Sequence, residues 1–253
     1  MIQPTLFIGA ILAFLSACIY FYVGHVLGRR RQTSSGPGMA WLMFVIWWYA
    51  LALGTLSGGI LSLLGAFGIV DLPLFTTITI INLFTVCVAL WGLLYYLIYL
   101  YTGNSSLIWP LGILYFLYYG YLVYFIEASD PIGVTVNRWN TSLQFQNTIR
   151  GPLYWGALLL LVFPQIIGSL AYFMLFFQVK ATTQRYRILL VSWSIVIWFM
   201  SSFLASASGL AQQDWWQIVS RLIALAASLT ILFAYQPPAW IKRRFGVAAI
   251  AEG

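Results

Sequence analysis

The chain has 253 residues, of which 62% are hydrophobic, 18% aromatic and only 7% charged, and its mean hydropathy is +0.91. Soluble domains carry about a quarter charged residues, because a surface in contact with water needs them. The composition therefore excludes a soluble globular domain and a disordered chain. It predicts an integral membrane protein that forms one domain over residues 1–253.

Seven apolar segments are each long enough to cross the roughly 30 Å hydrocarbon core of a bilayer. They cover about residues 4–27, 40–68, 74–101, 107–127, 152–179, 188–211 and 215–236. The predicted fold is thus all-α, a membrane-embedded bundle of seven helices surrounded by the lipid bilayer.

Basic residues are distributed unevenly between the predicted loops. Three ranges, 29–31, 180–187 and 242–244, hold three Lys or Arg each, whereas the loops on the other side hold only Arg138 and Arg150. Because cytoplasmic loops are enriched in Lys and Arg, this asymmetry predicts an external N-terminus and a cytoplasmic C-terminus. The net charge of +7 then reflects membrane orientation, and we expect no nucleic-acid partner.

The long loop at about 128–151, between the fourth and fifth helices, has an alternating pattern. Val134 and Val136 alternate with Thr135 and Asn137, and the alternation continues at 143–145. This spacing predicts a β-hairpin that covers the outer mouth of the bundle.

Arg221 lies about two turns inside the seventh segment, where a charge costs roughly 2.5–3.5 kcal/mol on insertion scales. Such a residue normally faces the bundle interior. Polar residues recur along this segment at helical spacing: Asp214, Gln217, Arg221, Ser228 and Tyr235. Arg221 is therefore either a ligand anchor or part of an interior salt bridge that locks helices together.

The partner of Arg221 is open at this stage. Asp214 lies two turns away, so we expect Arg221 to bond Gln217 or Asn82 of the third segment. A carboxylate would be reached through water or by contact with Glu127, at the outer end of the fourth segment. Asn82 and Glu127 are thus candidate ligand-binding residues, although interhelical hydrogen bonding is the alternative explanation of Asn82 and simple solvation that of Glu127.

Three further residues are candidates on weaker grounds. Trp193 and Trp198 of the sixth segment, with Trp47 and Trp48, either line a pocket for a flat apolar ligand or pack as bulk side chains. Pro164 interrupts the fifth segment, where proline kinks a helix and forms either a hinge or a packing feature.

Residues that carry chemistry are scarce. The sequence has one histidine, His25, and two cysteines, Cys18 and Cys87, which cannot form a bis-histidine haem site or a CxxC motif. Nucleophile elbows, phosphate loops and paired catalytic carboxylates are absent. We therefore expect no enzyme activity, no catalytic residue, no metal and no cofactor.

Seven helices with an external N-terminus and a hairpin resemble the rhodopsin and seven-helix receptor arrangement. Residues 235–245, YQPPAWIKRRF, are similar to the exits of bacterial seven-helix sensor regions. The resemblance implies a sensor in a bacterial cytoplasmic membrane. Retinal-binding rhodopsins need a lysine in the seventh helix, and segment 215–236 has none, which argues against a retinal protein.

Three functions fit this sequence. The first is a receptor-like seven-helix sensor that binds a small ligand in an outward-facing pocket near Arg221 and signals through a separate cytoplasmic partner. The second is a transporter or channel for a small solute or ion. The third is a non-catalytic subunit of a larger membrane complex.

Overall fold

The structure of the chain is a computed structural model, which describes residues 3–33, 38–138, 141–145, 163–207 and 214–246. Within these ranges the side chains of residues 30–33, 145, 165, 198–207, 214, 215, 217 and 245 lie outside the description. The described part is mostly helical and contains one small two-stranded sheet.

Eight helices occur in the described residues. They are α1 (Pro4–Thr33), α2 (Gly38–Ala66), α3 (Leu72–Thr102), α4 (Ile108–Ala128), α6 (Phe163–Gln178), α7 (Thr182–Ala207), α8 (Asp214–Tyr235) and α9 (Ala239–Phe245). The strands are β1 (Pro131–Val136) and β2 (Thr141–Phe145), which pair antiparallel with Val134 opposite Leu143.

Five helical segments among the described residues are long and apolar enough to cross a membrane. They are Pro4–Arg29, Gly38–Ala66, Leu72–Thr102, Ile108–Ala128 and Ile218–Tyr235. The apolar part of α6, Ile166–Gln178, is shorter. By the length and composition of its helices the chain is an integral membrane protein. The predicted segments 152–179 and 188–211 fall partly outside the described residues.

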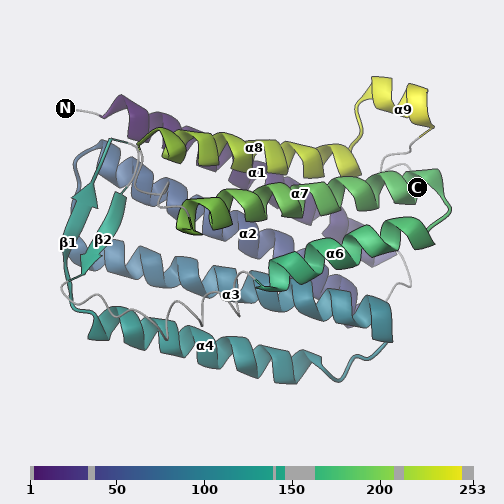
Figure 1. The fold of residues 1–253 in the computed structure, drawn as a ribbon, viewed down its shortest axis with the longest axis horizontal. Helices are drawn as coiled ribbons and strands as arrows, with labels where there is room; N and C mark the ends of the chain where they lie inside the picture. The colour runs from purple at the N-terminus through teal and green to yellow at the C-terminus, as the bar shows by residue number, and fades with distance from the viewer. Residues whose placement is uncertain (1–2, 34–37, 139–140, 146–162, 208–213, 247–253) are drawn as a thin grey trace.

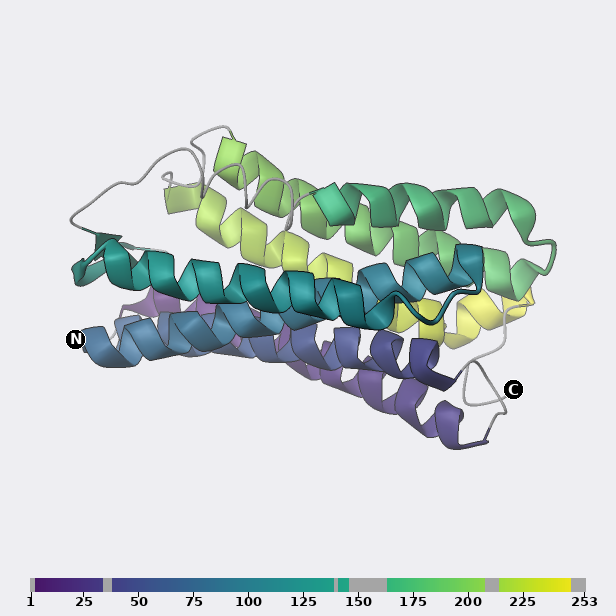
Figure 2. The ribbon, with the colours of Figure 1, turned by 90° about the horizontal axis from the view of Figure 1, so that it is seen from below.

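Six helices form a closed ring in two layers. Each of α1, α2 and α3 contacts the next, α3 contacts α6, α6 contacts α7, α7 contacts α8, and α8 returns to α1. Figure 2 shows α1 to α3 as one layer and α6 to α8 as the other. Helix α4 packs on the outside of this ring, against α3.

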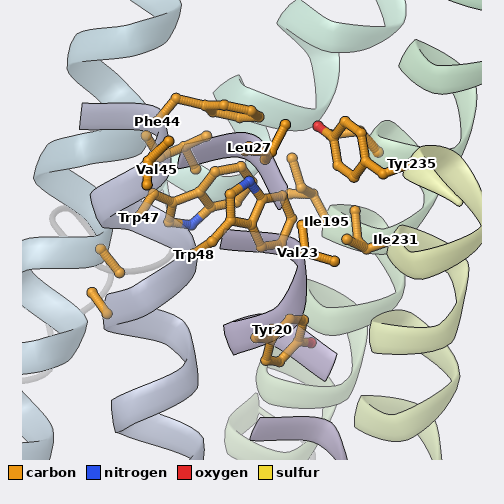
Figure 3. Close-up of a cluster of buried hydrophobic side chains, with 14 of the residues drawn as sticks. Tyr20, Val23, Leu27, Phe44, Val45, Trp47, Trp48, Ile195, Ile231 and Tyr235 are labelled. Atoms are coloured by element: carbon orange, nitrogen blue, oxygen red, sulfur yellow. The ribbon is translucent and has the colours of Figure 1, made fainter. Parts of the chain in front are cut away.

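Aromatic side chains fill the interior where α1, α2, α3, α6, α7 and α8 meet. Trp48 is 1% exposed and stacks on Tyr20 of α1, while Phe44 stacks on Tyr96 of α3 with ring centroids 4.3 Å apart. Figure 3 shows these α2 rings facing Tyr235 of α8. The large rings of one helix thus join the two layers.

Glycine permits the closest approach between α2 and α3. A Cβ atom built on Gly92 would lie 2.7 Å from the carbonyl oxygen of Met43, which is backbone and cannot move aside easily. Gly92 itself is buried. The backbones of α2 and α3 therefore pack at a distance that a larger residue would prevent.

The two ends of the bundle differ in charge. Helix α9 with Arg243, and the α6–α7 turn with Lys180, lie at one end (Figure 1). The α2–α3 turn, which contains Asp71, lies at the other end with Asp130 and the sheet. Asp71 caps α3, because its side chain accepts a hydrogen bond from the amide of Leu74 at 2.8 Å.

Candidate functional site

The candidate site is built around Arg221, which α8 presents to α2 across the two layers. Its Nη2 donates a hydrogen bond to the hydroxyl of Ser62 at 3.2 Å. The Ser62 hydroxyl in turn donates to the carbonyl oxygen of Gly58 at 3.0 Å, and the Ser62 side chain is 2% exposed. The guanidinium is therefore held by a hydroxyl oriented by the α2 backbone.

Small residues on α2 leave room for this guanidinium. Gly54, Gly58 and Ser62 recur every four residues, so they lie on one face of the helix. A Cβ atom on Gly58 would lie 3.6 Å from Nη1 of Arg221, an ordinary contact distance. The guanidinium thus lies directly over a helix surface that has no side chain at Gly58.

Among the described side chains, no bond joins Arg221 to Asn82. Asn82 instead donates to the carbonyl oxygen of Gly54 at 3.4 Å, and it thereby joins α3 to α2. Gly54 is one turn of α2 away from Gly58, over which the Arg221 guanidinium lies. Asn82 therefore bonds the α2 backbone about one turn farther into the bundle than Arg221. The side chain of Gln217, the other expected partner, lies outside the described residues.

The expected contact between Arg221 and Glu127 is also not found. Glu127 is exposed near the end of α4, and α4 packs outside the ring to which α8 belongs. Among the described side chains, no carboxylate pairs with Arg221. The side chain of Asp214, on the same helix, is outside the description. A positive charge thus faces the described interior with a hydroxyl as its partner.

The sheet lies against the same end of α1 and α2. The Thr141 methyl group occupies the space beside Gly65, where a Cβ atom would collide with it. Thr5 of α1 donates from its hydroxyl to the carbonyl oxygen of Arg138, in the segment that follows β1. Because Gly65 is less than one turn from Ser62, these contacts cover the end of the bundle next to Arg221.

The tryptophan pocket stays a prediction, and of the four candidate tryptophans only Trp47 and Trp48 line an interior cavity of the described part. A cavity of about 30 Å³ lies among α1, α2, α3 and α7, and its lining includes Tyr20, Trp47, Trp48 and Ser194. Trp193 does not line it, because its side chain points outward and is 54% exposed. The Trp198 side chain lies outside the description.

Pro164 lies in α6, and its side chain is buried. The part of the predicted segment that precedes α6, residues 152–162, is outside the description. A hinge at Pro164 therefore stays a prediction.

Sequence reasoning missed Ser62 and the Gly65–Thr141 contact. The signal that identifies them is the spacing of small residues in the second segment, which leaves one face of that helix without large side chains. The role of this small-residue face depends on which helix packs against it, and the sequence of one segment does not show which helix that is.

No protein-family model matches the chain, and neither a curated protein nor a solved structure matches it. Among the described residues, no group of three or more His, Cys, Asp or Glu side chains is placed to hold a metal ion. The fold and the site define a helical integral membrane protein with an interior cation near one end of its bundle.

Proposed function

We propose that this protein is a receptor-like membrane sensor that binds a small anionic ligand at Arg221 and signals through a separate cytoplasmic partner. The observation that carries the proposal is the bond between Arg221 and Ser62 across the two layers. The Arg221 guanidinium has five N–H donors and stays charged. Among the described side chains Ser62 takes one of these donors, and a carboxylate or phosphate could accept from others.

The proposed topology has seven spans, in which α6 and α7 belong to the fifth and sixth. The N-terminus is external, and the β1–β2 hairpin is the outer lid of the ligand pocket. The gathering of basic residues at the α9 end supports this orientation, because the cytoplasmic side of a membrane protein carries the excess of Lys and Arg.

The route for the signal runs along α8. Arg221 contacts α2 near the hairpin, and Tyr235 contacts Trp48 of α2 in the other half of the bundle, with ring centroids 6.4 Å apart. The two contacts are 14 residues apart on each helix, which is roughly 21 Å along the helix axis. A ligand that replaces Ser62 as a partner of Arg221 would favour a shifted position of α8. That shift would move α9, which follows α8 directly.

The test measures ligand-induced changes in melting temperature for the protein in lipid nanodiscs. Small carboxylates and phosphate monoesters are compared with their uncharged amides and alcohols. At least one anion should raise the melting temperature of the natural protein, because binding to the folded state stabilises it. Its uncharged analogue should have no effect.

Two variants with the same loss of charge separate a binding role from a general electrostatic one. Arg221→Met should abolish the anion-induced shift, whereas Arg243→Met, in the exposed part of α9, should retain it. If Arg221→Met lowers the melting temperature strongly and leaves the shift intact, Arg221 is a structural lock. A panel in which no anion acts on the natural protein contradicts the proposal.

The transporter alternative requires a continuous polar path along α8 from Arg221 to Tyr235. Ser228 lies on that stripe, but it is 0% exposed and its hydroxyl donates to the carbonyl oxygen of Leu225 at 2.8 Å. Tyr235 meets the Trp48 ring at its edge. These contacts favour the sensor over the transporter.

A further inference from the structure

A second candidate binding site lies on the outside of the ring, between α3 and α4. It is a groove of about 230 Å³, whose walls include Phe84, Cys87 and Trp91 of α3 and Gly112, Phe116 and Tyr119 of α4. It is far in the sequence from Arg221 and shares no residue with the site described above.

Aromatic contacts close the groove at both of its ends. At one end the Trp91 ring lies against Gly112, where a Cβ atom would come within 2.7 Å of it, and the Trp91 indole donates to the carbonyl oxygen of Ile108 at 3.0 Å. At the other end Phe84 and Tyr119 meet edge to face with centroids 5.3 Å apart. The distance along each helix between these two end contacts is seven residues, or roughly 10 Å.

Among the described residues, nothing covers the side of the groove. Phe116 in its wall is 69% exposed and Phe84 is 46% exposed. Both residues lie near the middle of helices that are long and apolar enough to cross a membrane. At this depth of a bilayer the surrounding medium is hydrocarbon, so the occupant must come from the membrane itself.

We propose that this groove binds the ring system of a cyclic membrane lipid. Its walls are aromatic and otherwise apolar, apart from the Cys87 thiol and tyrosine hydroxyls, so they suit hydrocarbon and provide little for a charged or strongly polar group. A rigid ring also loses less conformational freedom on binding than a flexible chain. The two closed ends fit a compact ring and interrupt the path of an extended acyl chain.

The experiment compares two photoreactive lipids in nanodiscs that contain the whole protein. One is a sterol with a diazirine on its ring system, and the other is a phospholipid with a diazirine on a straight acyl chain. Cross-linked residues are mapped by mass spectrometry. The sterol probe should label residues 84–91 and 112–119 preferentially and should be displaced by excess unlabelled sterol, whereas the acyl probe should label the exposed helices broadly.

A matched pair of variants on α4 tests the groove directly. Phe116 forms a wall of the groove, and its neighbour Leu117 is exposed to a similar extent, 69% against 65%, without forming part of the lining. Phe116→Ala should reduce sterol labelling roughly three- to tenfold, the size expected when one aromatic contact is lost. Leu117→Ala should leave it unchanged.

Both substituted positions are exposed, so neither variant removes interior packing. Equal labelling of the groove by the two probes would show that ordinary acyl chains fill it and would overturn the proposal. Equal effects of the two variants, or sterol labelling that lies elsewhere on the protein, would also overturn it. The sensor proposal is untouched by each of these outcomes, since none involves Arg221.

Discussion

Trp48 of α2 and Tyr235 of α8 meet edge to face, with ring centroids 6.4 Å apart and an interplanar angle of 82°. Arg221 and Ser62 join the same two helices in the other half of the bundle. From the first pair to the second, the residue number rises by 14 on α2 and falls by 14 on α8, as expected for two antiparallel helices. The chain thus ties α2 to α8 once through rings and once through a guanidinium.

Replacing Trp48 with alanine should destabilise the protein by roughly 3–5 kcal/mol, as for other large aromatic residues removed from a packed interior. Trp48 is 1% exposed and packs against rings from α1 and α8. Trp193→Ala is the matched control, since Trp193 is 54% exposed. Thermal unfolding followed by intrinsic fluorescence measures both. Similar losses in the two variants would contradict the packing described for α2.

Gly92→Ala should lower stability by about 1–3 kcal/mol through overpacking, because the added methyl group meets the Met43 carbonyl oxygen. Gly120→Ala on α4 introduces the same methyl group with no atom within 4 Å, so it should be neutral or slightly stabilising. The difference in melting temperature between the two variants is the measurement. A stable Gly92→Ala protein would show that α2 and α3 are farther apart than described.

Gly65→Ala should loosen the β1–β2 sheet, because its new methyl group would collide with the Thr141 methyl group. Thr141→Ser removes that methyl group, so the double variant should recover most of the loss. Limited proteolysis within residues 131–145 reports the release of the β1–β2 sheet. If the double variant is cleaved as fast as Gly65→Ala alone, the two residues do not touch.

The proposed orientation predicts the location of four reporter fusions. Fusions after Gly36, Ala181 and Gly253 should read as cytoplasmic, and a fusion within residues 140–142 should read as external. The basic residues gather at the α9 end of the bundle, and loops rich in Lys and Arg stay on the cytoplasmic side of the membrane. An external signal after Ala181 would reverse the orientation and would place the Arg221 site on the cytoplasmic side.

Supplying the purified protein with retinal should produce no red-shifted absorption band. Segment 215–236 contains no lysine whose amine could form a Schiff base, and its only cation is Arg221. Absorption spectra before and after addition of hydroxylamine are the measurement. A band that hydroxylamine bleaches would show that an amine elsewhere in the chain reaches the retinal.

Local sequence patterns predicted the strands but did not predict the partner of Arg221. β1 and β2 form a small antiparallel sheet within the range where the sequence alternates, since alternation is a property of neighbouring residues. Among the described side chains Arg221 bonds Ser62 and meets neither Asn82 nor Glu127, while the alternative partner Gln217 lies outside the description. The partner depends on how the helices are arranged around the ring, in which α8 lies between α7 and α1, reaches α2 with the Arg221 side chain, and leaves α4 outside.

Composition and hydropathy by themselves determined that the chain is a helical membrane protein. Long apolar segments are unstable in water, and within a bilayer a helix bonds all of their backbone polar groups internally. Composition and hydropathy also determined that Arg221 needs an interior partner. Only the tertiary structure decided that this partner is Ser62, that Trp193 faces outward while Trp48 faces inward, and that α3 and α4 enclose a groove. In a membrane helix nearly every face is apolar, so hydropathy does not distinguish a side that packs on protein from one that faces lipid. That distinction comes from the shapes of small and large residues on helices that meet only after folding.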